Sequence, residues 1–224
     1  MQRLEVQPQL VDRVYAAILD AICTGRLEPG ARITQDGLAE TLAVSRQPVL
    51  QALLLLKKQG FVRDTGRRGL VVAPLDRQTV EQLYQVRGAL DGLAARQAAQ
   101  RSDGTAAARG AGLIVKGRKA ALGRDVERLI QADLEFHRFI YELSGNPLIA
   151  ESAALHWQHI RRVMGAVLRS DRLDHVWNEH EAILALILAG DAAGAESRAR
   201  AHAEDAARAL AAELAAIDTE KRYA

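Results

Sequence analysis

The stretch AVSRQPVLQALLLLKKQGFVRDTGRRG, residues 43–69, contains the helix and hairpin that decide the fold of the first third of this chain. Ser45 is placed to cap the helix, and Pro48 falls in its first turn, where a missing N–H costs little. Apolar residues at helical spacing predict an inner face of Val49, Leu53 and Leu56. The side chains left on the outer face are Arg46, Gln47, Leu50, Gln51, Lys57 and Lys58.

Two further helices are predicted before this one. An apolar residue recurs at every fourth position, at Leu10, Val14, Ile18 and Ile22. This stripe predicts an amphipathic helix that ends near Gly25 and the turn EPG, residues 28–30. A short helix is predicted over residues 35–42. After the third helix, FVRDTGRRGLVVAP, residues 61–74, predicts a two-stranded hairpin with glycines at its tip.

Helix, turn, helix and hairpin in this order form a winged helix-turn-helix, whose second motif helix enters the major groove of DNA. The residues expected nearest to DNA are Arg46 at the start of that helix and Arg67 with Arg68 at the tip of the wing. Two alternatives remain open. The charged side chains can simply be solvated, and a helix-turn-helix can serve as a dimerisation or scaffold module.

Length and charge divide the chain in two. The 224 residues suit two domains, which we place at residues 1–76 and 77–224. Residues 1–76 carry 10 basic and 8 acidic side chains, against 20 of each in residues 77–224, where all six histidines lie. The split predicts contact with a polyanion in the first domain and ligand or metal chemistry in the second.

The composition also bears on the compartment. Cys23 is the single cysteine, so no intramolecular disulfide can form and nothing points to an oxidising compartment. The first residues lack the apolar core of a signal peptide, and no run approaches the roughly 20 apolar residues of a membrane span. The expected location is the cytoplasm, with no membrane partner.

Residues 77–224 are predicted to form an antiparallel bundle of about six helices, so that the whole chain is mainly α with a small β-hairpin as its wing. The predicted helix breaks lie near residues 102–103, 123–125, 145–147, 170–171 and 190–191. Thr79 can cap the first helix after the linker APLDRQT, residues 73–79. In SGNP, residues 144–147, Gly145 suits a left-handed helix end, Asn146 can cap the next helix, and Pro147 can enter its first turn.

Polar side chains interrupt the apolar stripes of three of these helices. Asp133 and His137 lie one turn apart on the same face of one helix. His180 lies 10 residues before Gly190 and His202 lies 12 after it, on two helices joined by that turn. With a rise of 1.5 Å per residue, both histidines lie about 15–18 Å from the turn, and therefore at the same level of the bundle.

A shared metal ion is one way to satisfy these buried polar groups. An unpaired charge or imidazole is costly in an apolar interior, and one carboxylate with three imidazoles is a metal-binding set. Two alternatives remain open, because each histidine can be a hydrogen-bonded core residue and Asp133 with His137 an ordinary intrahelical pair. We expect surface or rim positions for His156, His159 and His175, and packing roles for Trp157 and Trp177.

The first domain resembles the winged helix of GntR-type bacterial transcription regulators. The matching segments are GRLEPGARI, LAETLAVSRQPVLQAL, GFV and GRRGLVV, within residues 10–73. The resemblance implies a homodimer that binds double-stranded operator DNA. We expect the DNA-contacting residues to be Arg46, Gln47, Leu50, Arg67 and Arg68.

The chain departs from the family pattern at three positions in this region. Leu50 and Gln51 stand where Arg and Glu are common, and Asp36 stands where some members place a DNA-contacting arginine. A good bidentate base contact is worth about 1–3 kcal/mol, so the loss of an arginine matters. We therefore expect a different or weaker operator preference, with Leu50 against a thymine methyl and a shallower salt dependence of binding.

The second domain is similar to the all-helical effector domain of the FadR subfamily, so the resemblance covers nearly the full length. It lies in YQVRGALDGLAA, DLEFHRFIYELSGN and EHEAILALILAGDAAGAESRARAH, residues 84–95, 133–146 and 179–202. Many members of the subfamily hold a divalent metal ion through one Asp and three His. The matching residues here are Asp133, His137, His180 and His202. Zinc is the first choice of metal, with nickel, manganese and iron as alternatives.

The resemblance also implies a ligand for the metal-binding domain. Arg87 matches an arginine that the family often directs into its cavity, and a guanidinium suits the carboxylate of a small organic or sugar acid. Asp91 stands where the family usually has Glu. The alternative for Arg87 is an intrahelical pair with Asp91.

Together these features predict a metabolite-responsive transcription regulator, a repressor, rather than an enzyme. The rival is a metal-dependent enzyme acting on a small carboxylate, since Asp and His ligands also suit hydrolysis. Against it, no general base accompanies the cluster, because His180 and Glu181 do not begin an H-E-x-x-H motif. A third possibility is a structural helical dimer whose histidines are merely packed.

Overall fold

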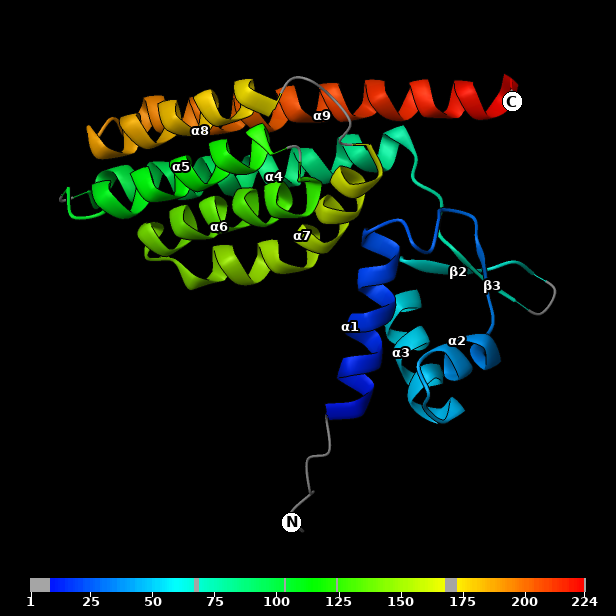
Figure 1. Cartoon of the computed structure of the whole chain (residues 1–224). Helices are drawn as coiled ribbons and strands as arrows, with labels where there is room; N and C mark the ends of the chain where they lie inside the picture. The colour runs from blue at the N-terminus through cyan, green and yellow to red at the C-terminus, as the bar shows by residue number, and fades with distance from the viewer. Residues whose placement is uncertain (1–8, 67–68, 103, 124, 168–172, 224) are drawn as a thin grey trace, which may run out of the picture. The chain divides into compact units, whose positions relative to one another are not determined.

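The computed structural model describes residues 9–66, 69–102, 104–123, 125–167 and 173–223 (Figure 1). The chain divides between Leu75 and Asp76 into two compact units. The described residues are mostly helical, with one small sheet, which confirms the predicted fold class. None of the described helices combines the length and apolar composition needed to cross a membrane. The predicted wing residues Arg67 and Arg68 lie outside the described residues, as do Asp103, Ser170 and Asp171 at two predicted helix breaks.

The N-terminal unit contains three helices, α1 (Gln9–Cys23), α2 (Gln35–Thr41) and α3 (Arg46–Lys58). Thr34 caps α2, because its side chain accepts a hydrogen bond from the backbone N–H of Gly37. Ser45 stands at the predicted capping position of α3, although its side chain makes no capping hydrogen bond. The three helices therefore begin and end close to where the sequence predicts.

The core of this unit follows the predicted helix faces. Val49, Leu53 and Leu56 on α3 are at most 2% exposed, and Val14, Ile18 and Ile22 on α1 are buried as well. Leu10, in the first turn of α1, differs from the prediction because it remains 47% exposed. The remaining core side chains are Leu19, Cys23, Ile33, Ala39, Ala52, Phe61, Val62 and Val72.

The wing is a sheet of three strands rather than the predicted two. The strands are β1 (Arg32–Ile33), β2 (Val62–Asp64) and β3 (Leu70–Val72), in the order β1-β3-β2, and both pairs are antiparallel. Ile33 pairs with Leu70, and Val62 pairs with Val72. Strand β1 was not predicted, because two residues are too few to show an alternating pattern.

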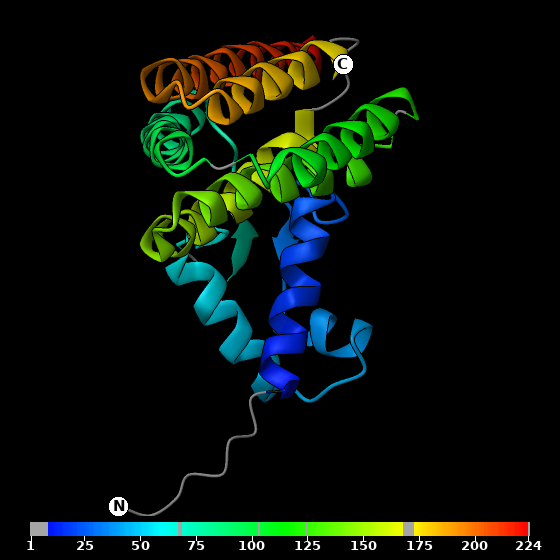
Figure 2. The same ribbon diagram turned by 90° about the vertical axis from the view of Figure 1, so that its left-hand side faces the viewer.

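The C-terminal unit contains six described helices, as predicted. They are α4 (Arg77–Gln100), α5 (Ala107–Leu122), α6 (Val126–Ser144), α7 (Pro147–Val167), α8 (Leu173–Leu188) and α9 (Ala192–Tyr223). The long helices α4 and α9 pack along each other, and α8 lies against α5 and α9 (Figures 1 and 2). This packing brings α4, α6, α8 and α9 together around one interior.

Helix ends in this unit show one correction and two confirmations. Asp76, not Thr79, caps α4, because its carboxylate accepts from both the backbone N–H and the hydroxyl of Thr79 at 2.8 and 2.7 Å. Gly145 ends α6 in the left-handed region with φ 66°. Pro147 is the first residue of α7, as predicted.

Candidate metal centre

Four polar side chains meet in the interior of the C-terminal unit. Asp133 and His137 come from α6, His180 from α8 and His202 from α9. Each offers one ligand atom, and these atoms all lie within 4.8 Å of one another. All four side chains are buried, with exposures between 0% and 4%. We call these four residues the ligand cluster.

The same imidazole nitrogen of each histidine faces the centre of the cluster. Nε2 of His180 lies 3.1 Å from Nε2 of His202 and 3.4 Å from Oδ1 of Asp133. Nε2 of His137 lies 3.7 Å from the same Asp133 oxygen. Three nitrogens and one oxygen therefore converge from three helices.

Arg87 on α4 reaches into the ligand cluster. Its Nη2 lies 2.5 Å from Nε2 of His137 and 3.3 Å from Oδ2 of Asp133. The intrahelical pair with Asp91 is also present, with Nε of Arg87 donating to Oδ2 at 3.2 Å. Because a guanidinium only donates hydrogen bonds, Nε2 of His137 is the acceptor in this contact.

Asp91 holds the outer side of His137. Its Oδ2 lies 3.2 Å from Nδ1 of His137, and its Oδ1 accepts a hydrogen bond from the hydroxyl of Tyr141 at 2.5 Å. Burial alone would raise the pKa of the Asp91 carboxyl, but His137, Arg87 and Tyr141 bring that pKa to about 2. Asp91 is therefore ionised and accepts from Nδ1, which leaves Nε2 of His137 facing the cluster, where its lone pair accepts from Nη2 of Arg87.

Glu179 on α8, which was not among the predicted site residues, holds the outer side of His202 in the same way. Its Oε2 lies 2.9 Å from Nδ1 of His202, and its Oε1 lies 3.6 Å from both His175 and Arg198. Burial raises the pKa of the Glu179 carboxyl, but the hydrogen bond to His202 and the neighbouring positive groups lower it overall. The one hint in the sequence is that Glu179 precedes His180.

His180 is surrounded by aromatic rings. Phe136 stacks on it with ring centroids 4.4 Å apart, and Trp177 meets it edge-on at 4.7 Å. Burial holds the pKa of His180 well below its usual value, and burial also lowers the pKa of His202. Both imidazoles are therefore neutral at physiological pH, which is the form that binds metal ions.

The donor set fits a divalent metal ion. Burial alone would raise the pKa of the Asp133 carboxyl, but Arg87 and His137 hold it well below its usual range, so Asp133 offers an ionised carboxylate oxygen. Burial and Arg87 lower the pKa of His137, but Asp91 and Asp133 raise it overall, so a metal ion would have to displace any proton on Nε2 of His137. Nδ1 of His180 is buried without a hydrogen-bond partner among the described residues. If that nitrogen carries the proton, the lone pair of Nε2 points to the other ligand atoms, as a metal ligand requires.

The tryptophans and the outer histidines lie largely where they were expected. Trp177 is fully buried, and Trp157 is buried with its ring 4.6 Å from Cζ of Arg87 and 5.2 Å from the ring of His137. Trp157 is thus packed, as predicted, but packed against the cluster. His156 and His159 are half-buried and His175 is exposed.

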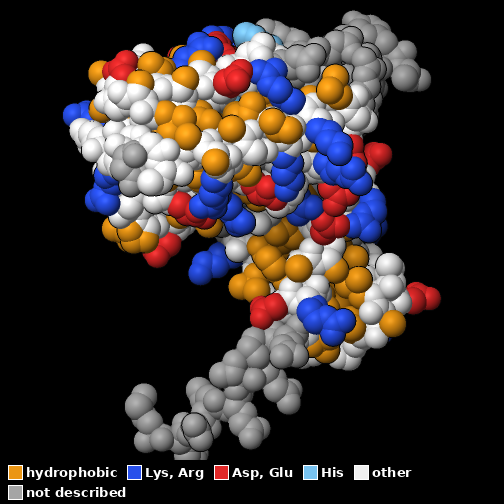
Figure 3. Space-filling view, turned by 60° about the vertical axis from the view of Figure 1, so that its left-hand side comes forward, with side chains coloured by type: hydrophobic (Ala, Val, Ile, Leu, Met, Phe, Trp, Pro, Cys, Tyr) orange, Lys and Arg blue, Asp and Glu red, His pale blue; other side chains and the backbone are white. Residues whose placement is uncertain are grey.

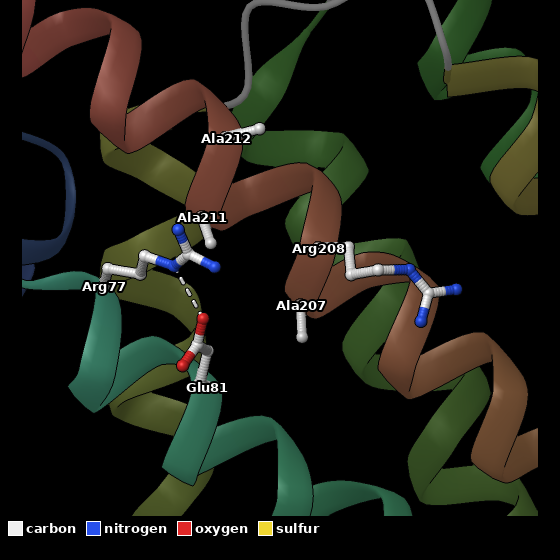
Figure 4. Close-up of a pocket in the computed structure, with 6 residues that line it drawn as sticks. All are labelled: Arg77, Glu81, Ala207, Arg208, Ala211 and Ala212. Carbon is white, nitrogen blue, oxygen red and sulfur yellow. Dashed lines mark hydrogen bonds and ion pairs between the residues drawn. The ribbon is translucent and has the colours of Figure 1, made fainter.

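A surface pocket of the same unit lies apart from the ligand cluster (Figure 4). It has a volume of about 160 Å³ and is lined by Arg77, Glu81, Ala207, Arg208, Ala211 and Ala212. Nε of Arg77 donates to Glu81 at 2.7 Å, so its charge is already paired inside the pocket. None of the lining residues belongs to the ligand cluster.

In the N-terminal unit, the predicted DNA-contacting residues that the structure describes lie on the outer face of α3. Arg46, Gln47 and Leu50 are exposed. Nε of Arg46 lies 2.8 Å from Oδ1 of Asp36 on α2. Leu54, one turn after Leu50, is exposed as well, at 56%.

Comparison with known proteins identifies both units. Residues 10–72 match the model for bacterial regulatory proteins of the gntR family, and residues 82–205 match the FCD domain. The Nta operon transcriptional regulator of Aminobacter aminovorans is 30% identical over 153 residues, which cover 68% of this chain and 72% of that protein. The HTH-type transcriptional regulator LutR of Bacillus subtilis is 28% identical over 204 residues, which cover 81% and 92%.

Other relatives match over a shorter stretch. An uncharacterized HTH-type transcriptional regulator of Mycobacterium tuberculosis H37Rv is 35% identical over 88 residues, which cover 39% of this chain. The match spans only 36% of the length of that protein.

Solved structures support the fold. Escherichia coli McbR/YncC has a TM-score of 0.75 at 22% identity, covering 90% of this chain and 97% of that one. A GntR transcriptional regulator from Rhodococcus sp. RHA1 has a TM-score of 0.73 at 23% identity, covering 89% and 96%.

These relatives are transcriptional regulators, which confirms the prediction that the chain is not an enzyme and removes the rival metal-dependent enzyme. The resemblance seen in the sequence is confirmed, and the chain belongs to the GntR family of bacterial transcription regulators, in the FadR subfamily, with an FCD domain.

Proposed function

We propose that this regulator is a cytoplasmic homodimer that represses transcription by binding operator DNA through residues 1–76, and that it senses a small organic or sugar acid at a metal ion in residues 77–224. The observation that carries the sensor half is the convergence of four buried ligand atoms within 4.8 Å of one another. The winged helix-turn-helix supports the DNA-binding half.

Asp133, His137, His180 and His202 would hold the metal ion. Zinc is the first choice because one carboxylate and three imidazoles suit it, and nickel, manganese and iron accept the same donors. A divalent ion with more than four coordination positions supplies a positive centre that a carboxylate or hydroxyl of the effector can join. Asp91 and Glu179 support the site from outside by fixing two of the imidazoles.

Arg87 is the proposed partner for the effector's carboxylate. Its guanidinium is buried beside the ligand cluster and contacts His137 and Asp133. An acid entering here would meet the guanidinium and the metal together, and a guanidinium pairs with a carboxylate through two parallel hydrogen bonds. This arrangement favours a small acid over a neutral ligand.

Exposed apolar side chains on the helical unit support dimer formation. Val115, Leu122 and Leu148 are 66%, 79% and 65% exposed. On the face of this unit drawn in Figure 3, hydrophobic side chains gather among charged ones. Exposed apolar patches of this kind often mark protein interfaces.

The effector would act by changing which conformation of the dimer is populated. A ligand can shift such an equilibrium only through its difference in affinity for the two states. The acid would favour the state whose two winged helices no longer match half-sites spaced along the duplex.

A thermal-shift screen of organic and sugar acids, with and without chelator, tests the sensor half. We expect at least one acid to raise the melting temperature only in the metal-loaded protein, because a ligand at 100 times its Kd stabilises the fold by about 2.7 kcal/mol. His180→Ala should lose both the metal and the response. Metal-free protein by elemental analysis, with melting unchanged by chelator, would rule out the metal sensor and favour packed histidines.

A further inference from the structure

An ion pair joins the first turns of the two motif helices. Nε of Arg46, at the start of α3, lies 2.8 Å from Oδ1 of Asp36 in the first turn of α2. Beside it, Nε2 of Gln35 donates to the backbone oxygen of Arg46 at 2.8 Å. The start of α3 is therefore tied to α2 through both a side chain and the backbone.

The pair has little to contribute to folding. The two side chains are 72% and 67% exposed, and exposed ion pairs of this kind contribute about 0–1 kcal/mol. The pair does offset an unfavourable interaction, because the positive charge of Arg46 lies at the positive end of the α3 dipole. Asp36, in contrast, stands at the favourable end of α2, whose start is fixed by the Thr34 cap. The pair therefore orients Arg46 more than it stabilises the unit.

The rest of the outer face of α3 makes that orientation important. One turn after Arg46 comes Leu50, and one turn later Leu54, both exposed and apolar. Lys57, at the far end of the helix, pairs with Asp64 on β2 at 2.5 Å. In a helix-turn-helix the N-terminal end of the second motif helix enters the major groove, and Arg46 is the cation at that end of α3.

We propose that Asp36 determines operator specificity by holding Arg46 in position to read a guanine in the major groove. This inference rests on the proposed DNA binding. With Nε of Arg46 directed at Asp36, the two Nη groups would form the fork that donates to O6 and N7 of guanine. Without the carboxylate, Arg46 is released to any nearby phosphate, where it adds affinity for all sequences alike.

The DNA ligand expected from this proposal is an operator half-site with a guanine facing the start of α3. A bidentate arginine–guanine contact discriminates against the other bases by about tenfold or more. A flexible arginine on a phosphate contributes no discrimination, and it adds about one released counterion per half-site to the salt dependence.

Selection from a random duplex DNA library tests this with the full-length chain. The variants are Asp36→Ala and, as a matched control, Glu40→Ala, which removes an exposed acidic side chain one turn later on α2. The duplex selected by the wild type is then titrated with each base in turn at every guanine of the half-site, over a range of salt concentrations. Melting temperatures of the variants show that each remains folded.

The wild type and Glu40→Ala should prefer one guanine of the half-site by about tenfold or more, whereas Asp36→Ala should bind all four bases at that position within about threefold. The salt slope of Asp36→Ala should be steeper by about one counterion per half-site. If both variants and the wild type discriminate between the bases equally, the proposed role of Asp36 is wrong, but the proposed DNA binding still stands. A wild type that selects no sequence would overturn the proposed DNA binding itself.

Discussion

Oε2 of Glu179 lies 2.9 Å from Nδ1 of His202, and both side chains are buried. Asp91 stands in the same relation to His137, with Oδ2 3.2 Å from Nδ1. Each carboxylate accepts from the outer ring nitrogen and so leaves Nε2 as the inward-facing lone pair. Two of the three imidazoles of the ligand cluster are therefore oriented by acidic side chains on other helices.

Glu179→Gln should weaken metal binding by about tenfold or more, because a neutral amide holds the His202 ring less firmly than a carboxylate does. The affinity can be measured by competition with a chromogenic chelator. Glu181→Gln is the matched control, since Glu181 lies two residues away, is exposed and pairs with Arg118. Equal affinities in the two variants would show that Glu179 does not support the site.

The ligand cluster could be predicted because its members follow rules that a sequence displays. Asp133 and His137 are spaced by one helical turn, and His180 and His202 lie at nearly equal distances from Gly190. Glu179 could not be predicted in this way. It lies next to His180 but about 100° around the helix, off the apolar stripe, and it is buried only because α9 brings His202 against it.

Local hydrogen bonds explain the smaller errors in the fold. Threonine is a common helix-capping residue, but here the carboxylate of Asp76 accepts the hydrogen bond from the backbone N–H of Thr79. Helix α4 therefore begins earlier than predicted. Strand β1 is held by pairing of Arg32 and Ile33 with β3, a contact that no periodicity within two residues can reveal. The start of α4 and the existence of β1 thus depend on hydrogen-bond partners that residue type and periodicity do not identify.

Asp76→Ala should lower the free energy of unfolding by about 1 kcal/mol at pH 7, because the cap of α4 is lost. Hydrogen bonds from the backbone and hydroxyl of Thr79 lower the pKa of the Asp76 carboxyl in the folded chain. The stabilisation is therefore complete above the ordinary carboxyl pKa and is lost as the pH falls through the lower, folded value. Urea unfolding over this range measures both effects.

Asp76→Asn separates the cap from its charge. Asparagine is also a good capping residue, so this variant should keep most of the stability at pH 7. The stability difference between the wild type and Asp76→Asn should shrink in acid, since only the aspartate titrates. A difference that stays constant with pH would contradict the assignment of the capping carboxylate.

Leu50→Arg should increase affinity for DNA and make its salt dependence steeper, by about one counterion per half-site. The reason is that Leu50 is exposed on the outer face of α3, where an added guanidinium can reach a phosphate or base. Binding is measured by fluorescence anisotropy on the selected duplex at several salt concentrations. Gln100→Arg adds the same charge at an exposed polar position of α4 and serves as the control. An unchanged slope for Leu50→Arg would place this face of α3 away from DNA.

Two glycines of α5 should respond in opposite directions to the same substitution. A Cβ at Gly117 would lie 2.1 Å from the ring of Trp177, whereas a Cβ at Gly112 meets no atom within 4 Å. Trp177 is fully buried and packs against His180, so it cannot move without disturbing the ligand cluster. Gly117→Ala should therefore lower the free energy of unfolding by about 1–3 kcal/mol and weaken metal binding.

Gly112→Ala should raise the free energy of unfolding by about 0.5–1 kcal/mol, because alanine favours the helix and meets open space. Urea unfolding of the two variants gives the comparison, and chelator competition gives their metal affinities. Loss of stability in both would contradict the open space beside Gly112. Gain in both would mean that Trp177 does not fill the space beside Gly117, and α8 would then lack the contact that positions His180.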